Sequence, residues 1–126
     1  MLKFNSLLIF SEKPEALAVF YKHVFNSKPI WEGEGYTTFK VGEGYITVGP
    51  HSDVHGKNHD SARMMFNFET EDVKSEFERI KQLGAHIIKE PYSMSEEDEG
   101  QIATFADPDG NYFQLMSPMP VDETSQ

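Results

Sequence analysis

The stretch TFADPDGNYFQLMSP, residues 104–118, outlines a β-hairpin more clearly than any other part of the chain. Its two arms contain β-branched and aromatic residues, which favour strands. Between the arms, Pro108 and Gly110 supply backbone angles that suit a turn. A similar stretch, TFKVGEGYITV (38–48), overlays on residues 104–115 when one extra residue is allowed in the second turn. The sequence therefore predicts the same hairpin twice.

A strand and a helix precede the first hairpin. Residues 4–10, FNSLLIF, have the pattern of a buried strand. An apolar stripe at helical spacing follows over residues 17–25, with Ser11 as the predicted cap and Asn26 as the predicted end. A short strand is expected near residues 28–31.

The same order begins again in the second half of the chain. Residues 63–69 are predicted to form a strand, and Thr70 is predicted to cap the helix that follows. The apolar stripe of this helix covers residues 73–83, and Gly84 marks its end. A strand is expected over residues 85–90. The repeat aligns Asn5 with Arg63 and Thr47 with Gln114, and it makes an internal duplication the simplest interpretation.

Composition narrows the class of protein. The chain has 126 residues, no cysteine and a net charge of −10. This length fits one domain, and the charge disfavours binding to nucleic acid. The absence of cysteine excludes disulfides, and no apolar run is long enough to span a membrane. We therefore expect a cytoplasmic protein with no membrane partner.

With these features, the chain resembles members of the vicinal oxygen chelate superfamily. This superfamily groups glyoxalase I, bleomycin-resistance proteins and extradiol dioxygenases. The resemblance rests on ALAVFYKHVF in the first helix, on the repeated hairpins and on TFADPDGNYFQLMSP. It implies an α+β fold of two βαβββ modules, each a half-barrel, with a cleft between them. It also implies one domain over residues 1–120, with modules at about 1–50 and 61–118, a linker at 51–60 and a loose tail at 121–126.

The resemblance also implies where a metal would bind. Metal-dependent members take ligands from the first and fourth strands of each module, usually His, Glu or Gln. At the matching positions this chain has Asn5, Thr47, Arg63 and Gln114. Only Gln114 is a good ligand, and the permanent charge of Arg63 opposes a cation. We therefore expect no metal and no other cofactor, with a divalent metal as the alternative.

The linker contains HSDVHGKNHD, in which His51, His55 and His59 are spaced by four residues. Gly56 and the preceding Gly49-Pro50 argue against a continuous helix that would align them. The favoured interpretation is a polar, solvated connection, and an adventitious metal site is the second. His51 is the candidate acid or base because it follows the fourth strand directly.

Several other side chains are candidates for ligand binding. Arg63 has a planar guanidinium that suits a carbonyl or anionic group, and an ion pair with a neighbouring acid is the equal alternative. Aromatic residues could line the cleft for a planar ligand, although strand aromatics are more often core. These residues are Trp31, Phe39, Tyr45 and Tyr112. Asp107 and Asp109 are explained by turn chemistry.

Three functions remain open at this point. The first is metal-independent binding of a small organic ligand, as the resemblance to bleomycin-resistance proteins implies. The second is a lyase or dioxygenase of glyoxalase type, with an unusual metal site or with metal-free chemistry by His51 and Arg63. The third is an interaction or regulatory subunit whose cleft is filled. The resemblance also implies a homodimer.

Overall fold

The computed structural model of the protein describes residues 1–93 and 100–118. The chain divides into two compact units, Met1–His59 and Asp60–Gln126. The predicted loose tail at 121–126 lies outside the described residues. Among the described helices, none is long and apolar enough to cross a membrane.

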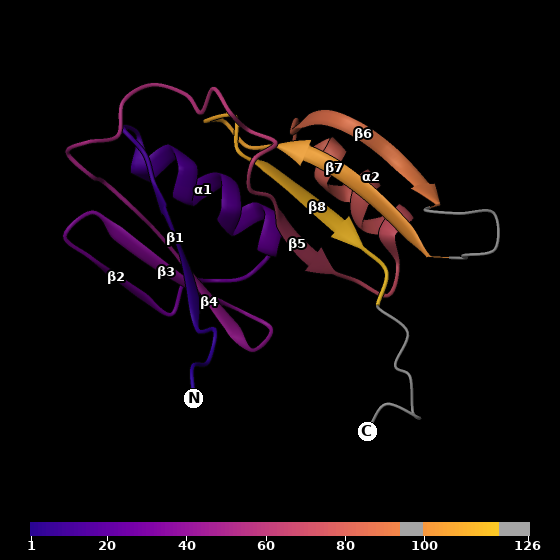
Figure 1. The fold of residues 1–126 in the computed structure, drawn as a ribbon, viewed down its shortest axis with the longest axis horizontal. Helices are drawn as coiled ribbons and strands as arrows, with labels where there is room; N and C mark the ends of the chain where they lie inside the picture. Colours follow the sequence, from indigo (N-terminus) through magenta and orange to yellow (C-terminus); the bar gives the residue numbers. More distant parts are fainter. Residues whose placement is uncertain (94–99, 119–126) are drawn as a thin grey trace. The chain divides into compact units, whose positions relative to one another are not determined.

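Unit 1 is one βαβββ module (Figure 1). Its sheet has the strand order β1-β4-β3-β2, in which β1 is parallel to β4 and the other pairs are antiparallel. Its elements are β1 Ser6–Phe10, α1 Pro14–Phe25, β2 Trp31–Gly33, β3 Tyr36–Val41 and β4 Gly44–Gly49.

Unit 2 repeats the same order of elements (Figure 1). Its sheet has the order β5-β8-β7-β6, again with one parallel pair, β5 and β8. Its elements are β5 Phe66–Glu69, α2 Val73–Gln82, β6 His86–Ser93, β7 Gln101–Ala106 and β8 Tyr112–Met116. The predicted fold of two βαβββ modules is confirmed.

Strand pairing confirms one half of the predicted overlay and corrects the other. Thr38 pairs with Thr47 in unit 1, and Thr104 pairs with Gln114 in unit 2, so the hairpins match as predicted. The overlay of the first strands is wrong by one residue. Leu8 pairs with Thr47, and Asn67 pairs with Gln114, so Leu8 and Asn67 are equivalent positions of the two units. The overlay had aligned Leu8 with Phe66 instead. A shift of one residue exchanges the two faces of a strand.

Strand limits also differ from the sequence-based prediction. The edge strand β2 begins at Trp31 rather than ending there, and β5 begins at Phe66 instead of residue 63. Both errors lie at strand ends, and Ile30, just before β2, still donates its N–H to the Thr38 carbonyl at 2.8 Å. Exposed Met64 and Met65 extend the apolar pattern without belonging to the strand.

The core of each unit lies between its helix and one face of its sheet. In unit 1, Phe39 is fully buried and meets Phe25 of α1, with 5.4 Å between ring centroids. In unit 2, Phe105 stacks between Phe77 of α2 and Phe113 of β8, at 5.1 and 5.6 Å. Phe39 and Phe105 occupy matching positions next to Thr38 and Thr104, so the two cores repeat as the hairpins do.

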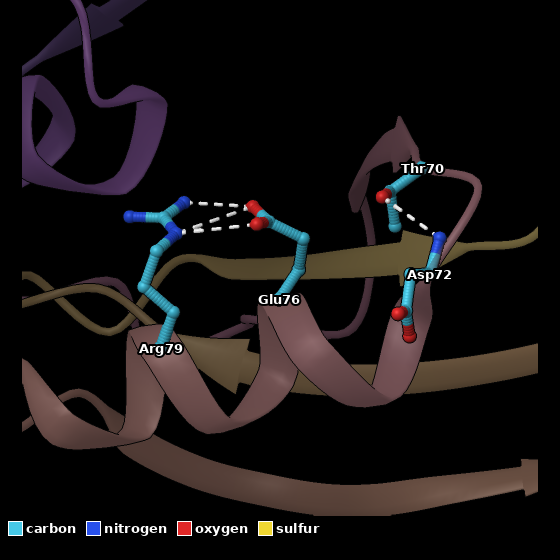
Figure 2. Close-up of polar contacts among 4 residues, drawn as sticks. All are labelled: Thr70, Asp72, Glu76 and Arg79. Carbon is cyan, nitrogen blue, oxygen red and sulfur yellow. Dashed lines mark hydrogen bonds and ion pairs between the residues drawn. The ribbon is translucent and has the colours of Figure 1, made fainter.

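The two helices begin differently. Asp72 is the N-cap of α2, and its carboxylate accepts a hydrogen bond from the Ser75 N–H at 3.0 Å. Thr70, the predicted cap, lies two residues earlier, and its hydroxyl accepts from the Asp72 N–H (Figure 2).

Helix α2 also contains an ion pair between Arg79 and Glu76, one turn apart, with 2.8 Å between the charged atoms (Figure 2).

Helix α1 has Lys13 as its N-cap, and this residue makes no side-chain capping bond. The predicted cap, Ser11, is buried and accepts from the Lys13 N–H. Both predicted caps therefore stabilise the turn before a helix and are not the caps themselves. The predicted end of α1 is confirmed, because Asn26 adopts a left-handed conformation with φ of 50°.

Candidate functional site

The open face of each sheet, the one turned away from its helix, carries the candidate site. Side chains alternate between the faces of a strand, so the buried core residues Ile46 and Val48 place Thr47 on the open face of β4. Thr38 of β3 lies opposite, and the two hydroxyl oxygens are 2.8 Å apart. Leu8 of β1 and Trp31 of β2 complete this cross-strand row.

Unit 2 has a matching row with different chemistry. Gln114 of β8 alternates with the buried Phe113 and Leu115. Its amide Nε2 donates to the Thr104 hydroxyl at 3.0 Å. Asn67 of β5 lies beside Gln114 and is exposed. Thr104 is buried, so this face presents two amides, where unit 1 presents half-buried hydroxyls between apolar side chains.

Two of the predicted site residues lie before the strands. Asn5 is exposed, and its backbone carbonyl accepts from the Tyr45 N–H at 3.1 Å. Arg63 is exposed, and its Nε donates to Asp60 Oδ2 at 2.6 Å. The ion pair was one of the two interpretations of Arg63, and the structure contains it. Neither residue pairs with Thr47 or Gln114 in the sheets.

Three of the four predicted aromatic residues lie on the open faces. Trp31 is on the open face of unit 1 and 54% exposed. Phe39 is on the helix side, where its ring belongs to the core. Tyr45 and Tyr112 are half-buried and lie two residues before Thr47 and Gln114, on the same faces of β4 and β8. Of the four, Trp31 is the most exposed.

Sequence reasoning overlooked three residues of the open faces, Leu8, Tyr36 and Asn67. Leu8 and Asn67 are the strand neighbours of Thr47 and Gln114. Tyr36 lies over Gly49, where an added Cβ would come within 2.0 Å of its ring. Alternation from the buried residues of each strand would have found all three once the strand register was known.

The linker histidines lie in an exposed segment, and His51 contacts unit 1. Its ring meets Phe10 edge-on at 5.0 Å, and its Nδ1 accepts from the Asp53 N–H at 3.1 Å. Since Nδ1 is occupied, Nε2 is the ring nitrogen that can donate. His51 also lines an open pocket of about 450 Å³ with Ser11, Glu12 and His55.

Glu12 holds this part of the linker to unit 1. Its carboxylate accepts from the Gly56 N–H and lies 4.0 Å from Nδ1 of His55. His59 is exposed and lies four residues further on. In the described residues, no group of three or more His, Asp or Glu side chains is arranged to hold a metal ion.

The open faces also do not fit a tightly held metal. Thr47 and Gln114 occupy the fourth-strand positions, and both are hydrogen-bonded to a threonine across the ladder. Their neighbours in β1 and β5 are Leu8, which has no donor atom, and the amide Asn67. Divalent transition metals bind through imidazole, thiolate or carboxylate, and these four side chains supply none of them.

The DPDGN turn is organised by the Asp107 carboxylate, whereas Oδ2 of Asp109 is buried without a hydrogen-bond partner among the described residues. Asp107 is buried, and its Oδ1 accepts from the N–H groups of Asp109 and Asn111, both at 2.9 Å. Its Oδ2 accepts from the Asn111 side-chain amide. Gly110 has a φ of 84°, which favours glycine. The turn prediction for these residues is confirmed.

Comparison with known proteins agrees with this architecture. The model of the Glyoxalase/Bleomycin resistance protein/Dioxygenase superfamily matches residues 3–115. Metallothiol transferase FosB of Shouchella clausii (strain KSM-K16) is 28% identical over 98 residues, which cover 76% of this chain. The matched part spans 66% of that relative, just under two thirds of its length.

Solved structures share the fold at low identity. A glyoxalase/bleomycin resistance protein/dioxygenase family enzyme from Burkholderia phytofirmans PsJN is 20% identical, with a TM-score of 0.75 over 94% of this chain and 100% of that one. Lactoylglutathione lyase from Agrobacterium tumefaciens is 15% identical, with a TM-score of 0.71 over 93% and 94%.

Proposed function

The chain belongs to the Glyoxalase/Bleomycin resistance protein/Dioxygenase superfamily, and on this premise we propose that it binds a small organic ligand without a resident metal. The ligand lies against the open face of one of the two sheets, and the protein acts by holding it. The proposed partners are this ligand and a second copy of the chain, in the cytoplasm.

One observation carries the proposal. The ladder positions that hold metal ligands in metal-dependent relatives are occupied here by Thr47 and Gln114, and their side chains bond to Thr38 and Thr104. A metal at these positions would gain only neutral oxygen donors, the Thr47 hydroxyl and Oε1 of Gln114. Neutral hydroxyl and amide oxygens are weak ligands for zinc or nickel, so the site favours an organic ligand.

The same groups can orient a ligand. Between Thr38 and Thr47, one hydroxyl donates to the other, so the pair keeps one O–H proton to offer. On the open face of unit 2, the half-buried Gln114 and the exposed Asn67 offer amide donors and acceptors instead. A site with a few polar groups among apolar side chains is typical of small-molecule binding.

Calorimetric titration of a small-molecule library against metal-free protein tests the proposal. We expect at least one ligand with micromolar affinity or better, unchanged by a chelator. Thr47→Val should weaken a ligand held on unit 1, and Gln114→Ala a ligand held on unit 2, because each removes hydrogen-bonding groups on its open face. Glu43→Ala, in an exposed turn, is the matched control. If no compound of the library binds measurably, or if binding needs added metal, the proposal is contradicted.

A second candidate is an enzyme of lyase or dioxygenase type. It is favoured by the names of relatives, a metallothiol transferase and a lactoylglutathione lyase. In this chain His51 would act as acid or base through Nε2, next to Phe10. A hemithioacetal isomerase assay with nickel or zinc tests this function. Turnover that falls in His51→Gln and persists in His59→Gln would support it over simple binding.

A further inference from the structure

The open face of unit 1 carries the rings of Phe10, Trp31 and Tyr36, and His51 of the linker packs edge-on against Phe10. Phe10, Tyr36, Trp31 and His51 form what we call the aromatic shelf. Phe10 pairs with Gly49 across β1 and β4, and Gly33 pairs with Tyr36 across β2 and β3. The register of β3 and β4 continues to place Tyr36 against Gly49. One cross-strand row therefore reads Phe10, Gly49, Tyr36, Gly33.

The two glycines of this row let the rings lie close to the sheet. A Cβ added at Gly49 would come within 2.0 Å of Cδ1 of Tyr36. A Cβ added at Gly33 would come within 2.8 Å of Cζ2 of Trp31. Both rings therefore cover backbone where a side chain would otherwise stand. The Tyr36 hydroxyl donates to the Pro50 carbonyl at 3.1 Å, which fixes that ring.

Protection of a strand glycine from water explains the position of Tyr36, but it does not explain why Trp31 remains exposed. Aromatic rings often protect a strand glycine from water, and a half-buried tyrosine does so here. The Trp31 indole rests on Gly33 and still leaves 54% of the residue exposed, beside Thr38 of the neighbouring strand. Tyr36 lies on the same face, across the ladder from Gly33. A large aromatic ring left exposed beside a second ring on one face marks a binding surface.

The chemistry of the shelf specifies its ligand. We infer that the proposed small-molecule ligand is a planar aromatic or heteroaromatic compound, neutral or cationic, that stacks on Trp31 and Tyr36. This inference rests on the proposed function. Ring stacking is favourable for flat π systems, and a cation gains further from the indole face. The Thr38–Thr47 hydroxyl pair, one row away, can bond a polar substituent. The indole face carries the negative side of the ring quadrupole, which disfavours a stacked anion.

Trp31 is the chain's single tryptophan, so its fluorescence reports on the shelf directly. The probes are quinoline, N-methylquinolinium, naphthalene-2-carboxylate and the saturated decahydroquinoline, each titrated by fluorescence and by calorimetry. We expect the first two to quench Trp31 saturably with matching calorimetric affinities, and the last two to bind at least tenfold more weakly.

Substitutions then separate the shelf from the rest of the protein. Trp31→Leu keeps an apolar residue and should weaken quinoline binding about tenfold by calorimetry, whereas Trp31→Phe should fall between. Tyr92→Leu, at an exposed aromatic residue of unit 2, should change nothing. Since Trp31 is largely exposed, the variants should keep the circular dichroism of the parent.

Each contrary result has a definite meaning. Binding of decahydroquinoline as tight as that of quinoline, or unchanged binding by Trp31→Leu, would overturn the stacking inference and leave the proposed function intact. Absence of binding by every planar probe would overturn the inference, and the library titration would then decide the proposed function separately. If Trp31→Leu instead dissociates a dimer in sedimentation without affecting probe binding, the shelf is a contact between copies of the chain.

Discussion

Units 1 and 2 share one βαβββ plan but present different open faces. At matching ladder positions, unit 1 has Leu8, Thr47 and Thr38, whereas unit 2 has Asn67, Gln114 and Thr104. The helix-covered faces are alike, with Phe39 in one core and Phe105 in the other. The comparison teaches that helix packing requires the same apolar pattern twice, while the open faces are free to differ.

Charge is also divided unequally between the units. Residues 1–59 contain six acidic and six basic residues, so the whole net charge of −10 belongs to residues 60–126. Unit 1 therefore combines a balanced charge with the aromatic shelf, and unit 2 combines negative charge with amides. The four predictions below test how far the two units are equivalent.

The largest effect is expected in the cores. Phe39→Ala and Phe105→Ala should each lower the free energy of unfolding by about 3 to 5 kcal/mol, because each empties a fully buried site. Urea denaturation followed by circular dichroism measures this loss. Val19→Ala, on the exposed side of α1, is the control and should cost less than about 0.5 kcal/mol. A loss below about 1 kcal/mol in either core would break the equivalence.

A smaller effect is expected from Gly49→Ala, which forces Tyr36 off the sheet of unit 1. We expect a loss of about 1 to 3 kcal/mol, typical of overpacking. Gly44→Ala, in the same strand, is the matched control because its added Cβ would lie 3.6 Å from its nearest neighbour, the Asn5 carbonyl oxygen, which is an ordinary contact. The cost of Gly49→Ala should shrink in a Tyr36→Ala background. Equal tolerance at both glycines would contradict the geometry of the shelf.

The hairpin turns should differ between the units. Asp107→Ala leaves the Asp109 and Asn111 N–H groups without their acceptor, so we expect a loss of about 1 to 3 kcal/mol. Glu43→Ala changes the exposed turn of unit 1 and should cost less than about 0.5 kcal/mol. Chemical denaturation measures both. An Asp107→Ala variant as stable as Glu43→Ala would show that the buried carboxylate does not organise the turn.

The smallest effects are expected at the helix starts. Asp72→Ala removes the cap of α2 and should cost about 1 kcal/mol. Lys13→Asp gives α1 a capping side chain that it lacks and should add up to about 1 kcal/mol. Thermal denaturation measures both shifts, with Glu71→Ala as the exposed control. Higher stability of the Asp72→Ala variant, or lower stability of the Lys13→Asp variant, would contradict the assignment of these residues as N-caps.

The sequence was sufficient to predict the fold because its signals are local. Two hairpins with turn residues, two helical stripes and their order define the modules, and the ladder partners of Thr47 and Gln114 follow from the hairpins alone. Thr38 and Thr104 were aligned correctly for this reason. The DPDGN turn was predictable because Asp107 bonds only two and four residues away.

The candidate site was harder to predict because it depends on pairing between distant strands. The parallel pairs β1–β4 and β5–β8 have no connecting turn to fix their register, and the overlay of Asn5 with Arg63 failed there. Phe39 and Trp31 look alike as strand aromatics, yet they lie on opposite faces. The shelf depends on Gly33 and Gly49, whose role appears only when the rings are in place.

Metal content tests the central claim most directly. The protein is dialysed against zinc, nickel, manganese and iron in turn, then against buffer, and the retained metal is measured by mass spectrometry. We predict retention far below one metal ion per chain for all four. Retention near one per chain that is lost in Gln114→Ala would contradict the proposal of a metal-free site. Retention that is lost only when His51, His55 and His59 are replaced would place the metal in the linker.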